Sequence, residues 1–292
     1  MMKRITLLIS LLSLLLSSCT EEMVFDPQDF ESLIGISGSI TDEYKYQEVV
    51  ISRTSDFYSE AEPEMVSGAK VFVHDNIDTI WFAETDNPGY YLSTQMFAGT
   101  PERTYHLNVE LSDEDGNKQY HAQSTMRNNV EQIDSVTIKQ YSFGGMVFDY
   151  YLGIYPYFQT LDEKDAYYMV KVGINDRILG SDTLNKCELF SMEGMSGIYF
   201  NSPFMTMLAG EMPVYFLNQK DSLEVLHKGD TVSLYLSVIP NEYASYILGA
   251  SSVNGTNPMM GASSNVPSNI FPKDSSVGFF HAASVIKYSL IY

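Results

Sequence analysis

Hydrophobic and polar residues alternate along most of the chain, and a period of two predicts β-strands rather than helices. In the first half, this pattern stops and restarts at turn-forming residues, most clearly at Asn87-Pro88-Gly89. The sequence therefore predicts successive short strands within 35–43, 46–57, 66–76 and 78–94.

The segment 104–126 is predicted to form a β-hairpin with its turn at 113–116. In that register, paired residues have numbers that sum to 229. One face of the hairpin is then apolar (Tyr105, Leu107, Val109, Leu111, Tyr120 and Ala122), and the other is polar (His106, Asn108, Glu110, Gln119, His121 and Gln123). One apolar and one polar face are typical of a β-sandwich sheet that has the core on one side and water on the other.

The second half continues the strand pattern and adds one helix. Helix 241–253 is predicted because Asn241 can cap its first turn and because tyrosines recur there at helical spacing. A pause in the pattern near 128–133 is interpreted as a domain boundary, and 191–212 receives no assignment. Strands are expected within 133–142, 148–160, 161–176 and 230–240, with a closing pair of strands across 276–292.

These elements predict an all-β protein of two domains. The first is a β-sandwich at 35–128, and the second is a β-rich domain at 129–292 that contains the one short helix. A chain of this length is sufficient for two domains with cores of their own.

The amino end combines two basic residues with a short apolar run at 5–16. A helix needs about 20 apolar residues to span a bilayer, so this run predicts a secretory signal peptide rather than a membrane span. Two serines directly precede Cys19, an arrangement similar to the bacterial lipobox, whose cysteine carries the lipid. We expect a lipoprotein signal peptide at 1–18 and a lipidated tether at 19–34, anchored to a bilayer through Cys19. The alternative is an ordinary signal peptide with a chance cysteine.

Glu21 and Glu22 follow the predicted lipidation site almost directly. Short acidic clusters at this position resemble the surface-export signal of lipoproteins in the Bacteroidota. They predict a location at the outer membrane, exposed on the cell surface. The alternative is that the two glutamates only begin a solvated tether.

The amino-acid composition indicates that the protein is folded, and it limits the partners and cross-links that the protein can have. A hydrophobic fraction of 45% with many aromatic residues argues against disorder. The net charge of −20 excludes nucleic acid as a partner, because such a field repels phosphate backbones. Only Cys187 remains as a thiol once Cys19 is lipidated, so neither an intramolecular disulfide nor a metal cluster with paired thiols is expected.

Five stretches of the chain form a recognisable set. They are VSGAKVFVHDN, NPGYYLS and AGTPERTYHLNVEL in the first half, and LDEKDAYYMVKV and VPSNIFPKDSSVGFFHAAS in the second. These stretches resemble a Bacteroidota lipoprotein family catalogued as domain of unknown function 4249. The likeness covers most of the chain after Cys19, and its motifs are structural rather than catalytic. The resemblance implies a first domain similar to immunoglobulin-like or transthyretin-like sandwiches, and the family has no agreed functional residues to carry over.

The resemblance implies a partnership with a TonB-dependent transporter, because members are often encoded beside such receptors. We predict a non-enzymatic surface lipoprotein that binds substrate for such a transporter, or caps or docks on it. The alternative is a structural or adhesive protein, whose apolar last strand at 285–292 could insert into another molecule. A third hypothesis is a hydrolase that acts on surface glycans or peptides.

The sequence lacks a nucleophile-elbow, a zinc-hydrolase and a phosphate-loop motif, so we predict no enzyme, no cofactor and no metal. Two weaker constellations remain. His106 and His121 lie diagonally on the polar face of the hairpin, with Glu110 near, and two imidazoles could share a metal or simply be solvated. Asp113 and Asp115 resemble part of a calcium loop, and they are equally what a hairpin turn requires.

Two further surfaces have open interpretations. Tyr150, Tyr151, Tyr155 and Tyr157 could form a stacking surface for sugars or peptides, or could fill the gap between two sheets. The Met-rich stretch at 191–212 could face a receptor, because methionine suits adaptable contacts, or could be an irregular insertion into the core.

Overall fold

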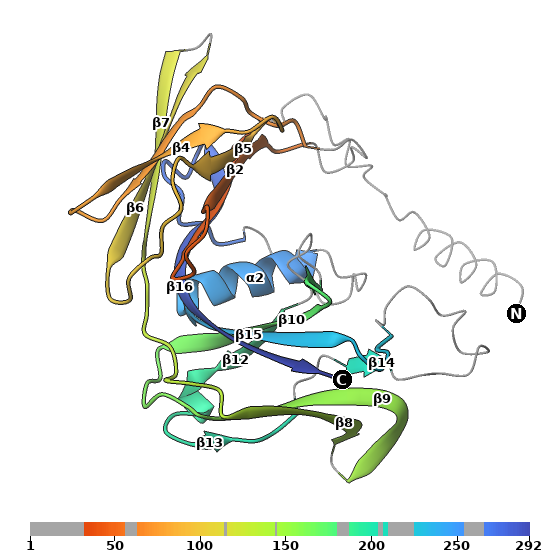
Figure 1. Ribbon diagram of the computed structural model, residues 1–292. Helices are drawn as coiled ribbons and strands as arrows, with labels where there is room; N and C mark the ends of the chain where they lie inside the picture. Colours follow the sequence, from red (N-terminus) through yellow and green to blue (C-terminus); the bar gives the residue numbers. More distant parts are fainter. Residues whose placement is uncertain are drawn as a thin grey trace, which may run out of the picture. The chain divides into compact units, whose positions relative to one another are not determined.

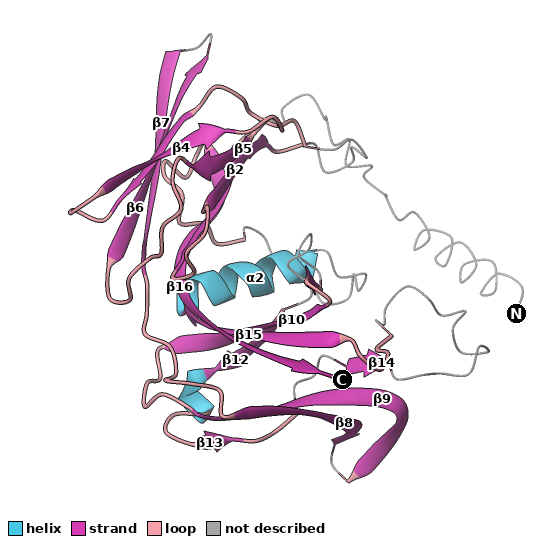
Figure 2. Cartoon of the chain, viewed as in Figure 1, coloured by secondary structure: helices cyan, strands magenta, loops and turns pink. Residues whose placement is uncertain are grey.

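The computed structural model describes residues 32–55, 63–113, 116–143, 145–179, 187–203, 207–209, 225–253 and 266–292. Strands predominate in these ranges, and they accompany one α-helix, α2 (Asn241–Val253) (Figures 1 and 2). The predicted all-β, sandwich-like fold class with one short helix is confirmed.

Twelve strands form one large sheet. Their order is β11-β10-β15-β16-β1-β2-β5-β4-β3-β6-β7, and β12 also pairs with β10. The strands predicted within 35–43 and 46–57 appear as the antiparallel pair β1–β2, and the hairpin predicted at 104–126 appears as the antiparallel pair β6–β7. The bounds are β1 (Ile34–Thr41), β2 (Glu48–Arg53), β3 (Lys70–His74), β4 (Thr79–Glu84), β5 (Tyr90–Ser93), β6 (Thr104–Asp113), β7 (Gly116–Thr125), β10 (Ala166–Ile174), β11 (Arg177–Ile178), β12 (Glu188–Ser191), β15 (Thr231–Pro240) and β16 (Ser276–Ile291).

The last strand, β16, corrects the predicted pair of closing strands, because it is one continuous strand of 16 residues. Its first half, 276–283, pairs in parallel with β1, and its second half, 284–291, pairs antiparallel with β15. Strands of globular proteins rarely exceed about 10 residues, so the pattern favoured two strands. The alternation of apolar and polar residues within 276–292 also does not indicate which distant strands pair with this segment.

Residues of β1 to β7 and of the first half of β16 form the first hydrophobic core. Its buried members come from 34–126, together with Ile270, Phe280 and Ala282. The apolar face predicted for the β6–β7 hairpin is buried in this core, and the predicted register is confirmed, since Thr104 pairs with Thr125. The Ala282 backbone N–H donates to Ser124 Oγ at 2.9 Å, which joins β16 to β7 and closes the layer.

A smaller four-stranded sheet surrounds β9 (Met146–Gln159) in the second half of the chain. Together with β10 and β15, it encloses a second core of residues from 130–238. The unassigned stretch 191–212 contains a short 3-10 helix, η3 (Met192–Gly194), and two of these strands. The partners of β9 are β8 (Ser135–Phe143), β13 (Tyr199–Phe200) and β14 (Met207–Ala209).

Helix α2 forms where the sequence predicts a helix, and it packs on the large sheet. Tyr243 and Ile247 of the helix are buried in a third cluster that includes Met169, Ile239 and Phe279 of β10, β15 and β16. Among the residues that the structure describes, no helix is long and apolar enough to cross a membrane.

The segment between the predicted domains is fastened to the sheet. Asn129 Nδ2 donates to the backbone oxygens of Leu236 at 2.8 Å and Ser284 at 3.0 Å. Ser284 Oγ donates to the backbone oxygen of Arg127 at 2.8 Å. Residues Ser32–Tyr292 form one compact unit, and the division at 128 stays a prediction.

Candidate functional site

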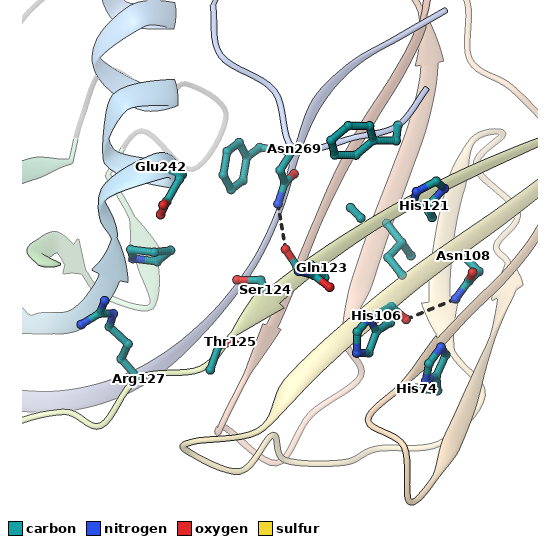
Figure 3. Close-up of a pocket in the computed structure, with 15 residues that line it drawn as sticks. His74, His106, Asn108, His121, Gln123, Ser124, Thr125, Arg127, Glu242 and Asn269 are labelled. Atoms are coloured by element: carbon teal, nitrogen blue, oxygen red, sulfur yellow. Dashed lines mark hydrogen bonds between the residues drawn. The ribbon is translucent and has the colours of Figure 1, made fainter. Parts of the chain in front are cut away.

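An open cavity of about 770 Å³ lies over the polar face of β3, β6 and β7. The first turn of α2 and the segment that leads into β16 form its other sides (Figure 3). The lining is rich in imidazole, amide and aromatic groups, which come from His74, His106, Asn108, His121, Gln123, Asn269, Phe271 and Phe279. Arg127 and Glu242 add two charged groups.

The floor of this groove follows from the alternation along β3 and β6. Because Val71 and Val73 of β3 and Leu107 and Val109 of β6 point into the core, the residues that alternate with them point to the opposite face of the sheet. From this set, His74, His106 and Asn108 line the groove. Antiparallel pairing then places His74 directly opposite His106.

The rings of His74 and His106 are stacked, with centroids 4.8 Å apart and planes 15° apart. Burial and the neighbouring His74 lower the pKa of His106, so His106 favours the neutral form. A neutral imidazole can both donate and accept a hydrogen bond. The pairing of β3 with β6 brings these two histidines together. These strands are not consecutive in the chain, so the local pattern of the sequence does not predict the pair.

The segment 269–272 is attached to β7 and forms one wall. His121 and Phe271 exchange two backbone hydrogen bonds, of 3.0 and 2.9 Å, and their rings are stacked with centroids 5.6 Å apart. Asn269 Nδ2 donates to the backbone oxygens of Gln123 and Phe280, and Asn269 Oδ1 accepts from the Phe280 N–H. These bonds hold Phe271 on the polar face of the sheet.

Two charged side chains complete the lining. Glu242 comes from the first turn of α2, and Arg127 comes from the segment after β7 (Figure 3). Arg127 Nη1 lies 3.3 Å from Glu163 Oε2, so its charge is partly balanced within the protein. The groove therefore offers hydrogen-bonding groups of several kinds.

The metal hypotheses receive no support from the geometry of the described residues, which contain no group of three or more side chains that could hold a metal. His106 and His121 lie on the same face as expected, and each stacks on another ring, His74 and Phe271 respectively. Asp113 ends β6, and Asp115 lies outside the described residues.

The other sequence candidates fall at separate places. Tyr155 is 5% exposed and lies under Lys139, whose Nζ is 4.1 Å from the ring centroid, whereas Tyr151 and Tyr157 are half-buried. Nothing is described of the Tyr150 side chain. Within 191–212, Met192 is fully buried, which agrees with the core alternative for that residue. The predicted lipidation and export residues Cys19, Glu21 and Glu22 lie outside the described residues.

A second cavity, of about 880 Å³, lies between the outer face of β1 and β2 and the end of α2. Its lining is largely apolar or hydroxylic, and includes Ile36, Val50, Tyr246 and Val266. The first groove is the stronger candidate, because it gathers side chains that can orient a ligand by directed hydrogen bonds.

Comparison with known proteins gives a family and little else. A model of the family described as Domain of unknown function (DUF4249) matches residues 20–289. No curated protein matches the sequence. Among solved structures, the chicken interferon gamma receptor alpha chain is similar over 71% of this chain and 89% of that one, with 9% identity and a TM-score of 0.17. A likeness this weak carries no argument about fold or function.

Proposed function

The chain therefore belongs to the DUF4249 family, and we propose that it is a non-enzymatic lipoprotein of the outer-membrane surface in the Bacteroidota. In this proposal, it is a substrate-binding or accessory partner of a TonB-dependent transporter. The observation that carries the proposal is the open groove of about 770 Å³, lined by imidazole, amide and aromatic side chains.

The groove has the composition of a binding site. Specific recognition of a small or extended ligand needs a concave surface with a few fixed polar groups beside apolar ones. Asn269 and the segment that carries Phe271 are fixed by hydrogen bonds to β7 and β16, so these groups are positioned before a ligand arrives. Preorganised groups lose less conformational entropy on binding.

The serine in the groove supports binding rather than nucleophilic catalysis. Ser124 is buried, with 7% of its surface exposed, and its Oγ accepts a hydrogen bond from the Ala282 N–H. A catalytic serine needs a general base within hydrogen-bond reach and an exposed Oγ. Ser124 instead joins two strands.

The amino end supports the surface location. The two serines before Cys19 match the cleavage and lipidation pattern, and Glu21 and Glu22 match the export signal. A diacylglyceryl group together with an N-acyl chain is sufficient for stable anchoring. A protein held in this way has its groove in the medium outside the cell, where a transporter's substrate arrives.

The pairing and packing of the last strand give little support to the adhesive alternative. Residues 284–291 pair with β15, and Ile286, Tyr288 and Leu290 pack against the second core. The segment that could have been donated to another molecule thus contributes to the chain's own fold. Deleting it is a poor test of adhesion, because the deletion also opens a core.

The test is a gene deletion, complemented with the wild-type chain or with Cys19→Ala, and grown on single nutrient sources. We expect a growth defect on particular nutrients, restored by the wild-type chain and not by Cys19→Ala, which should leave the membrane fraction. Surface attachment of the same strains is measured in parallel. A loss of attachment without a nutrient-specific defect would favour the adhesive alternative, and a fully functional Cys19→Ala would refute the anchor.

A further inference from the structure

The polar face of the sheet carries a row of four ring-bearing side chains and one asparagine, and this row extends beyond the groove. Trp81 pairs with Phe72, Phe72 pairs with Asn108, and Asn108 pairs with His121 across β4, β3, β6 and β7. Phe271 continues the row through its bridge to His121. We call these five residues the aromatic row.

Resting on the proposed function, we propose that the aromatic row binds an extended, neutral oligosaccharide. Trp81 and Phe271 are the stacking platforms at its two ends, and Asn108 and His121 are the hydrogen-bonding groups between them.

The first argument is the exposure of the row. Trp81 is 51% exposed and Phe271 is 43% exposed, so both rings present apolar surface to the solvent. Phe72 supports Trp81, with ring centroids 4.9 Å apart, and His121 supports Phe271 at 5.6 Å. Supported rings present apolar surface to the medium at a low entropic cost, which is typical of ligand-binding surfaces.

The second argument is the length of the row. Neighbouring strands lie about 4.8 Å apart, so four inter-strand steps separate Phe271 from Trp81 by about 19 Å. This distance exceeds a monosaccharide and suits a short oligosaccharide lying across the strands. The His74–His106 pair lies beside the row and adds imidazole donors and acceptors along the same path.

The third argument separates a sugar from a peptide. Extended peptides usually bind by adding a strand to a free sheet edge. The row lies instead across β4, β3, β6 and β7, where β4, β3 and β6 each have paired strands on both sides. Recognition must therefore come from side chains, and the available ones match a sugar: flat rings for its C–H faces, and amide and imidazole groups for its hydroxyls.

The net negative charge of the protein favours neutral sugars over acidic ones. The chain carries 37 acidic residues against 17 basic ones, and this field disfavours uronic-acid or sulfated chains. The cations near the row already have partners in the protein. Lys273 Nζ lies 4.9 Å from the centroid of the Phe271 ring and donates to the backbone oxygen of Ser268. Lys70 Nζ of β3 lies 3.6 Å from Glu110 Oε2, and Arg127 lies beside Glu163. A neutral oligosaccharide avoids this repulsion.

The chain offers a direct test, because Trp81 is its only tryptophan. The full lipidated protein in detergent is titrated with neutral gluco-, manno- and xylo-oligosaccharides of graded length. Tryptophan emission is followed, and affinities are confirmed by calorimetry. We expect at least one series to shift the emission and to bind more tightly with length until the row is spanned.

Variants then locate the site. Trp81→Ala and Phe271→Ala should each weaken binding about tenfold, as for the loss of one aromatic contact. Trp81→Phe, which keeps a ring, should recover most of the affinity, and so distinguishes a lost platform from a misfolded sheet. Tyr44→Ala is the matched control, because Tyr44 is 71% exposed and lies outside the row. It should bind as the wild type does.

Two results would overturn the inference. One is the absence of binding by every neutral series, and the other is binding that Trp81→Ala and Phe271→Ala leave unchanged. Either result would leave the transporter partnership open to its own test. Conversely, sugar binding by a protein that has no nutrient-specific role would keep this inference and remove the proposed function.

Discussion

Gly278 is the residue on which the parallel seam between β16 and β1 depends most directly. Its φ of 106° lies in a region that side chains other than glycine rarely adopt. A Cβ at this position would collide with the backbone of Ile36, its partner on β1. The close approach of the two strands therefore requires the absence of a side chain.

We expect Gly278→Ala to lower the free energy of unfolding by about 3–5 kcal/mol, because backbone strain and a clash with a paired strand add together. Gly68→Ala is the control. Its φ of 79° is also left-handed, but nothing lies within 4 Å of its added Cβ, so only about 1 kcal/mol should be lost. Urea unfolding of both variants measures the difference. Equal losses would show that the seam tolerates a side chain.

At the scale of elements, helix α2 is joined to the sheet by a buried aromatic cluster. Tyr243 of the helix stacks on His281 of β16, with ring centroids 3.8 Å apart and planes 13° apart. Burial, with a contribution from Lys171, lowers the pKa of His281 to about 3. The helix is thus docked on an imidazole that stays neutral over the physiological range.

This docking predicts a pH dependence of stability. The ordinary pKa of histidine is about 6.5, so below that pH the unfolded chain takes up a proton that the folded chain does not. His281 should therefore cost the folded state about 2 kcal/mol between pH 8 and pH 5. His281→Phe keeps a ring against Tyr243 and should lose this part of the dependence.

Urea unfolding of the wild type and of His281→Phe at the two pH values measures it. If wild type and His281→Phe lose the same stability on acidification, the imidazole is not buried in the way described.

Elements could be predicted from the sequence where their pairing is local. The β6–β7 register follows from a turn and two alternating strands, and α2 follows from its cap and spacing. The parallel seam of β16 with β1 joins residues more than 200 positions apart, and no local pattern specifies it. The groove escaped prediction for the same reason. Its histidine pair and its Phe271 wall depend on contacts between strands and segments that are not consecutive.

At the scale of the whole molecule, the large sheet connects both cores, and its strands β3, β6 and β7 present a polar face to the groove. Strand β16 belongs to the first core through Phe280 and to the second through Ile286. This continuity holds the groove between the polar face of the hairpin and the start of α2. In the proposed function, the lipid on Cys19 places that groove at the cell surface, beside the transporter that receives its ligand.

The most direct test of the central claim, partnership with a transporter at the outer membrane, is affinity purification of the lipidated chain from native outer membranes in mild detergent. Mass spectrometry identifies what co-purifies. We predict a TonB-dependent barrel in stoichiometric amount. It should be lost from the preparation when Cys19→Ala removes the anchor. Recovery of the lipoprotein alone, or only of copies of itself, would contradict the account.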